Sequence, residues 1–223
     1  MKKTAILLTL AAILCSCVNI NINGGKTVKC DGPVTEQVMD FSGFSQISVE
    51  GAVEIDFVQA DTYNVLVTAN EDVFNYLDYR QEENKLVFST KDHVNINAKE
   101  YKVLVQAPVL KSFKVEGASK FHLNNGYKSS ENLETQVDGA AKMDLNGVEV
   151  PSLDIEMNGA GEFTLSNIKV VNLEVEVNGA AKGSISGTAD NAEITVAGAA
   201  RIDISKLQCP NVEKHVEGLG VIK

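Results

Sequence analysis

The chain has 223 residues, with 20 Lys or Arg against 30 Asp or Glu, a formal net charge of −10 at pH 7. This length predicts one domain or one elongated repeat array, and 44% hydrophobic residues argue against wholesale disorder. The acidic balance argues against a nucleic-acid partner, because phosphate binding needs a basic surface. Aromatic residues are only 6% and Trp is absent, which weakens any site built on ring stacking.

Residues 1–16 have the pattern of a lipoprotein signal peptide. Lys2 and Lys3 precede an apolar run from Ala5 to Leu14, which is too short to span a bilayer. The segment Leu14-Cys15-Ser16-Cys17 then resembles a bacterial lipobox. We therefore expect cleavage before Cys17 and attachment to a membrane through lipid on that residue. A buried N-terminal helix is the alternative.

Residues 17–40 are expected to hold the lipidated Cys, a tether over 18–27 and a first strand at about 34–40. Two further cysteines, Cys30 and Cys209, lie far apart in the sequence. If the repeats described below stack linearly, roughly eight or nine steps of ~4.8 Å separate them. A disulfide needs Cα atoms within about 7 Å, so we expect free thiols unless the N-terminal segment folds back.

A Gly-Ala motif recurs through the chain and is the main signal in it. Val137-Asp138-Gly139-Ala140-Ala141-Lys142 returns, with small changes, around six further glycines. The glycines expected at structural corners are Gly51, Gly117, Gly139, Gly159, Gly179 and Gly198, and Gly218 closes a decayed copy. The gaps after Gly117 are 22, 20, 20, 19 and 20 residues, and the 66 residues before it equal three periods of 22.

Apolar and polar residues alternate on both sides of each Gly-Ala. In Leu173-Glu174-Val175-Glu176-Val177 the spacing is that of a strand and not of a helix. Coils of about 20 residues with small-residue corners predict an all-β solenoid, in which stacked coils share one core. The corner glycines fit places where successive backbones approach closely. An antiparallel sandwich of similar hairpins is the alternative.

Residues 58–111 are more diverged. The segments 63–68, 85–89 and 101–105 are predicted strands, and 72–83 fits either a short helix or a hairpin arm. The β-helix domain is expected to span 41–223, with a C-terminal cap at about 212–223.

The stretch from Phe41 to Ile55, the Gly-Ala repeats and Lys85-Leu86-Val87-Phe88 resemble a bacterial family. It is called the "putative auto-transporter adhesin, head GIN domain" family and is common in lipoproteins of Bacteroidetes. The resemblance covers residues 41–205 and implies a right-handed parallel β-helix, a single strand of chain wound into coils. It brings no catalytic residues. Lipoproteins of this group that reach the outer face often carry acidic residues after the lipidated Cys, and Val18–Asn23 has none.

In a solenoid, equivalent residues stack into columns about 4.8 Å apart. The third position after each Gly holds Glu54, Glu162 and four basic residues, and the four form a stripe that suits an anionic glycan: Lys120, Lys142, Lys182 and Arg201. The fifth position before each Gly gives an acidic column, which suits a cation such as Ca²⁺: Glu134, Asp154, Glu174 and Glu193. For both sets we favour ordinary solvated side chains, since exposed pairs are common and contribute little. No confident metal site results.

Enzymatic interpretations have little support in the sequence. His93, His122 and His215 lie in three different contexts without a metal-ligand spacing, and neither a Gly-x-Ser-x-Gly elbow nor a phosphate loop occurs. We therefore expect no enzyme and no cofactor.

The expected function is non-enzymatic binding or adhesion to glycan or protein by a lipid-anchored outer-membrane protein, facing the cell surface or the periplasm. One alternative is a periplasm-facing structural or envelope-maintenance lipoprotein, and a second is a polysaccharide-acting enzyme. The expected assembly is a monomer or a weak end-to-end dimer.

Overall fold

The computed structural model describes residues 26–223, so the predicted signal peptide and Cys17 lie outside the described residues. The described chain is all-β, which confirms the predicted class. Its elements are β1 (Thr27–Cys30), β2 (Val34–Met39), β3 (Gln46–Gly51), β4 (Glu54–Gln59), β5 (Asn64–Asn70), η1 (Glu71–Asn75), β6 (Leu77–Glu82), β7 (Lys85–Thr90), η2 (Lys91–His93), β8 (Asn95–Ala98), β9 (Tyr101–Ala107), β10 (Ser112–Leu123), β11 (Tyr127–Lys128), β12 (Leu133–Asn146), β13 (Val148–Gly198), β14 (Arg201–Gln208), β15 (Asn211–Gly218) and β16 (Val221–Ile222). Within these residues, neither short 3-10 helix is long and apolar enough to cross a membrane.

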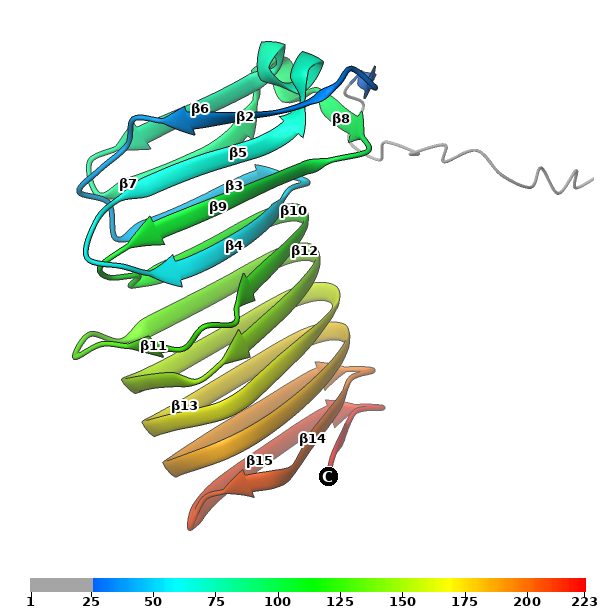
Figure 1. The fold of residues 1–223 in the computed structure, drawn as a ribbon. Coiled ribbons are helices and arrows are strands. Elements are labelled where there is room, and N and C mark those ends of the chain that lie inside the picture. Colours follow the sequence, from blue (N-terminus) through cyan, green and yellow to red (C-terminus); the bar gives the residue numbers. More distant parts are fainter. Residues whose placement is uncertain (1–25) are drawn as a thin grey trace, which may run out of the picture.

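The Gly-Ala repeats lie side by side in register. Gly117 pairs with Gly51 on one side and with Gly139 on the other, and Gly139 pairs with Gly159, all in parallel. We call each pass of the chain through such a Gly corner a rung. Strands β10, β12 and β13 run through their corners unbroken, and Figure 1 shows these rungs stacked along the long axis of the molecule.

The corner glycines have a backbone that other residues rarely adopt. Gly139 has φ +141° and Gly159 has φ +137°. A Cβ on either residue would overlap the carbonyl oxygen of the corner glycine one rung earlier. Glycine is therefore favoured at this position for two reasons: it adopts the left-handed backbone without strain, and it leaves room for the neighbouring rung.

The expectation of three stacked periods between Gly51 and Gly117 is wrong. These glycines occupy neighbouring rungs, and most of the chain between them folds beyond Gly51 at the N-terminal end. There β5 pairs antiparallel with β2 and β9, and β6 pairs antiparallel with β7. The sheet is therefore mixed, and the finer expectation of one right-handed parallel β-helix stays a prediction. Strand alternation is the same in parallel and antiparallel pairs, so it does not distinguish them.

The predicted strands at 63–68, 85–89 and 101–105 are confirmed as β5, β7 and β9. The expected first strand is β2, and the undecided segment 72–83 contains most of η1 followed by the hairpin arm β6. At the other end, the residues of the expected cap extend the ladder, and their role as a cap stays a prediction. Strand β15 adds a parallel strand to β13, and β16 pairs with β14.

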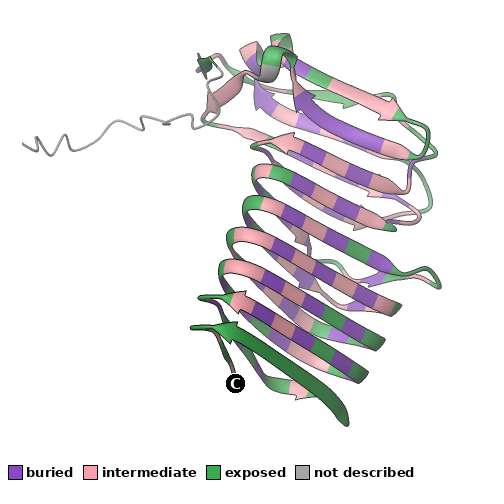
Figure 2. Cartoon of the chain, turned by 180° about the vertical axis from the view of Figure 1, so that it is seen from behind, coloured by how far each residue is buried: buried purple, intermediate pink, exposed green. Residues whose placement is uncertain are grey.

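The core lies between the walls of the stack and runs from Val28 to Ile204. Buried and more exposed residues alternate along the rungs that precede β15, as Figure 2 shows. The rings of Phe113 and Phe121 stack across this interior with centroids 3.7 Å apart. Cys30 is buried, Cys209 is half-buried, and both are free thiols.

Candidate functional site

The acidic column lies on the outer face of the wall formed by the first half of each rung. Glu134 pairs with Asp154, and Glu193 pairs with Glu213, so Glu213 extends the column by one rung. Burial raises the pKa of Glu174, and the charges of Asp154, Glu193 and Glu176 raise it further. The carboxylates are therefore close enough to repel one another. Glu213 was missed because Gly218 belongs to the decayed repeat, although the same count of five positions finds it.

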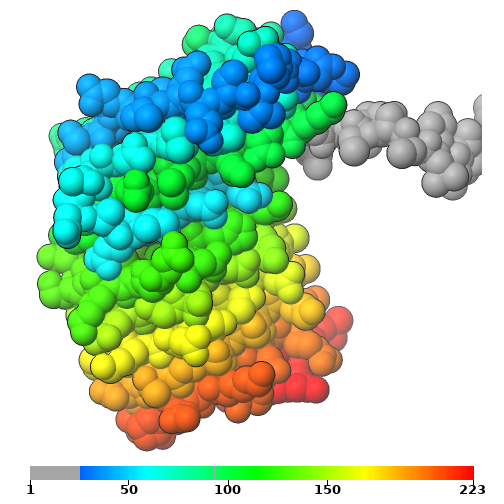
Figure 3. Space-filling model, viewed as in Figure 1, coloured from blue at the N-terminus to red at the C-terminus, as the bar shows by residue number. Residues whose placement is uncertain are grey.

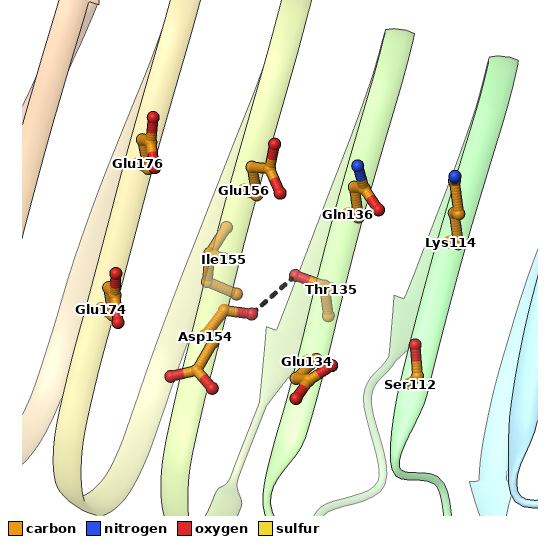
Figure 4. A pocket seen from close by; sticks show the side chains of 10 residues that line it. All are labelled: Ser112, Lys114, Glu134, Thr135, Gln136, Asp154, Ile155, Glu156, Glu174 and Glu176. Carbon is orange, nitrogen blue, oxygen red and sulfur yellow. Dashed lines mark hydrogen bonds between the residues drawn. The ribbon is translucent and has the colours of Figure 1, made fainter.

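A shallow hollow of about 270 Å³ opens on this face. Figure 4 shows the side chains around it lying on neighbouring rungs. Three of its carboxylates belong to the acidic column, and the other lining residues are Ser112, Lys114, Thr135, Gln136, Ile155, Glu156 and Glu176. Lys114 faces Glu116 at 3.0 Å and Asp138 at 3.9 Å, which leaves the middle of the hollow acidic.

A ladder of amide side chains holds part of this surface. Asn158 Nδ2 donates to Asp138 Oδ1 at 3.0 Å, and Asn178 Nδ2 donates to Asn158 Oδ1 at 3.0 Å. The same two amides donate to Glu156 at 2.6 Å and to Glu176 at 2.8 Å. These bonds fix the carboxylates in place beside the acidic column. The sequence signal for the ladder is Asp or Asn just before the corner Gly in three successive repeats.

The acidic column does not build a metal centre in the described part of the chain. Residues 26–223 contain no group of three or more His, Cys, Asp or Glu side chains placed to hold one ion. The carboxylates stand on separate rungs instead of converging on a point, and Ca²⁺ needs six to eight oxygens at one point. The face is thus an acidic surface.

The basic stripe is interrupted and largely paired. Glu162 lies in register with Lys142, in the same column. Lys120 pairs with Glu54 at 3.0 Å, and Lys182 faces Glu162 at 3.9 Å. Lys142 lies 3.6 Å from Asp144, and Arg201 pairs in register with Lys182 one rung away. Since neighbouring acids neutralise most of these cations, the stripe offers a weak surface for an anion.

The contact between His122 and Asp144 is the arrangement nearest to a catalytic pair. Nδ1 of His122 lies 3.1 Å from Oδ2 of Asp144, and both side chains are mostly buried. Oδ2 of Asp144 also lies 3.6 Å from Nζ of Lys142, so the pair belongs to the network of surface ion pairs along the basic stripe. The geometry agrees with a structural pair on the outer surface.

The shape of the molecule is an elongated block with extended faces, as Figure 3 shows. Solved structures share it. A protein of Parabacteroides distasonis described as a putative lipid binding protein is 20% identical, with TM-score 0.68, over 88% of this chain and 98% of that one. A putative adhesin of Bacteroides fragilis is 15% identical, with TM-score 0.62, over 88% and 99%. One of Parabacteroides merdae is 18% identical, with TM-score 0.58, over 89% and 98%.

These likenesses establish the fold, because the identities are low. No curated protein matches the chain. A family model matches residues 43–223, which is nearly all of the stack described above. The chain belongs to the family called "putative auto-transporter adhesin, head GIN domain".

Proposed function

We propose that this protein is a lipid-anchored protein of the outer membrane that binds a macromolecule without catalysing a reaction. The binding surface is the outer face that carries the acidic column. The observation that carries the proposal is the shape of that face. It presents carboxylates on successive rungs, some of them fixed by the amide ladder, across a shallow hollow. Extended charged faces of this kind suit another surface more than a small substrate.

The charge of this face favours one class of partner. Carboxylates repel anionic glycans and attract basic protein surfaces, and the lysines of the basic stripe are largely neutralised. We therefore infer that a protein with a basic patch is the preferred partner, ahead of an anionic glycan. Family membership supports adhesion as the biological setting.

The test is a binding screen of the chain from residue 18 onward on immobilised basic peptides and on neutral and anionic glycans. This deletion removes none of the core, which begins at Val28. Binding to basic peptides that weakens with salt, and that the triple variant Glu134→Gln, Asp154→Asn, Glu174→Gln removes, supports the proposal. The matched control replaces Lys120, Lys142 and Lys182 by Gln. Loss of binding in the control variant, or binding only to anionic glycans, would contradict the proposal.

Anchoring through Cys17 would hold the N-terminal end of the stack close to a membrane. Residues between Cys17 and Lys26 reach at most about 30 Å when fully extended. Incorporation of a labelled fatty acid that the Cys17→Ala variant abolishes would support this anchor. Release of reducing ends from polysaccharides by the purified chain would instead favour the enzymatic alternative.

We also propose that the rungs from β10 onward are coils of a right-handed parallel β-helix. Parallel pairing at the repeat spacing supports this, together with amide bonds between residues 20 apart, such as that from Asn178 to Asn158. A crystal structure tests the hand of the winding.

A further inference from the structure

The last rung of the stack leaves a strand edge open. All eight residues of β15 are exposed, and β13 is its one partner strand within residues 26–223. Figure 2 shows this strand exposed along its length, unlike the rungs above it. An open edge of this length is a template for pairing with another strand.

The open edge carries core-type positions. Val212 pairs with Ala192 and Val216 pairs with Val196, and both partners are buried. Yet Val212 is 36% exposed and Val216 is 46% exposed, because no further rung covers them. Leu219, just after the corner, is 87% exposed. Lys214, in register with buried Ile194, lies between the two valines, so the interior reaches the surface here as apolar positions on either side of one lysine.

The backbone of β15 shows which groups are free to pair. The N–H of Leu219 donates to the carbonyl of Gly198 at 2.8 Å, so the odd-numbered residues turn their polar groups toward the preceding rung. In a parallel ladder the alternate residues turn theirs the other way. The N–H and C=O groups of residues 212, 214 and 216 therefore face outward.

We propose that a second copy of this chain occupies the edge, with the two β15 strands antiparallel and paired about a two-fold axis at Val216. The choice of axis follows from charge. An axis at Lys214 would place two lysines opposite each other, and an axis at His215 would place Glu213 opposite Glu217. Like charges directly opposite destabilise a strand pair.

An axis at Val216 avoids both conflicts. It sets Val216 against its own copy and His215 opposite Glu217 in each of two symmetric pairs. Lys214 then faces Gly218, which has no side chain to oppose it. A strand that is self-complementary in this way suits an isologous, closed dimer.

The position of this contact gives it a role that rests on the proposed lipid anchor. Strand β1 pairs with β8, and β8 and the C-terminal rung lie at opposite ends of the stack (Figure 1). A chain anchored before residue 26 would carry β15 at its membrane-distal tip. Copies on two facing membranes would then meet tip to tip, so the tip would add a contact between copies of the same protein to the binding of basic partners by the acidic face.

The first test measures the mass of the chain from residue 18 onward by light scattering and sedimentation over a range of concentrations. We expect a monomer–dimer equilibrium that Val216→Asp weakens about tenfold or more, since it places two carboxylates at the axis. Val38→Asp is the matched control, because Val38 is an exposed valine on the open edge strand β2 at the opposite end. A strict monomer overturns the inference, and so do open-ended oligomers that both variants break.

The second test fixes the register by disulfide formation in a Cys209→Ser background. Val216→Cys should link to its own copy, since Cα atoms opposite in an antiparallel pair lie about 5.5 Å apart, within disulfide range. Lys214→Cys should link poorly. The reverse ranking contradicts the proposed axis.

A third test separates this inference from the proposed binding of basic partners. Phosphatidylcholine vesicles with chelating lipid carry the chain through a His tag at either end. N-terminal tethering should cluster the vesicles, and Val216→Asp should disperse them, whereas C-terminal tethering should not cluster them. Dimers in solution without vesicle clustering refute the tip-to-tip role alone. The triple acidic-column variant should cluster normally, because its residues lie outside the contact.

Discussion

Replacement of one corner glycine by alanine tests the stacking of the rungs most sharply. Gly159 and Gly51 both have strongly positive φ, +137° and +132°. A Cβ at Gly159 would overlap the carbonyl oxygen of Gly139, whereas a Cβ at Gly51 would meet no atom within 4 Å. The pair thus separates the cost of the backbone conformation from the cost of the close approach.

The left-handed backbone alone costs of order 1–3 kcal/mol for a residue with a side chain, so Gly51→Ala should lower the free energy of unfolding by about that amount. Gly159→Ala should lose about 2 kcal/mol or more beyond this, because two packed rungs must separate to admit a methyl group. Denaturation in urea, followed by circular dichroism, measures both variants. Equal losses would refute the argument that close approach selects glycine here.

The remaining predictions concern the core, one carboxyl group and the thiols. A Cβ at Gly183 would overlap the ring of Phe163. Gly183→Ala should therefore lower the free energy of unfolding of the wild-type chain by about 1–3 kcal/mol, and by clearly less in a chain that also carries Phe163→Leu. An equal loss in both backgrounds would contradict the contact. The raised pKa of Glu174 favours its protonated form in the folded state. Its contribution to stability therefore falls as pH rises above about 4.5, and Glu174→Gln should raise the melting temperature at pH 7 but not at pH 3.5. Burial raises the pKa of the Cys30 thiol. Iodoacetamide should therefore label Cys209 in the folded chain and Cys30 only after unfolding, and the masses of the labelled peptides measure this. Labelling of Cys30 in the folded chain would contradict the prediction.

Local patterns were enough to predict the strands and the glycine corners. Alternation such as that of residues 173–177 identifies a strand wherever it lies, and a repeated Gly-Ala marks one position in each rung. The order in which the rungs stack was harder to predict from the sequence. The 66 residues from Gly51 to Gly117 match three periods, yet β3 lies directly beside β10. A periodic distance in sequence cannot reveal that the intervening chain folds back at one end.

For the candidate site, too, local patterns in the sequence predicted some features and not others. Counting from each glycine found the acidic column, and the observed registers of Glu134 with Asp154 and of Glu193 with Glu213 agree with that count. The same kind of count places Glu162 in the column of the basic stripe, and the structure adds its distance of 3.9 Å from Lys182. The decayed repeat at about 212–223 predicted a cap, and it is the structure that shows β15 paired on one side only within residues 26–223.

The central claim is that this protein presents its stack outside the cell to bind a partner. Protease treatment of intact cells, with an antibody against the stack and a sealed periplasmic protein as control, tests it most directly. We predict that the protein is cleaved while the periplasmic control survives. Protection until the outer membrane is opened would contradict adhesion and favour a periplasm-facing role in envelope maintenance.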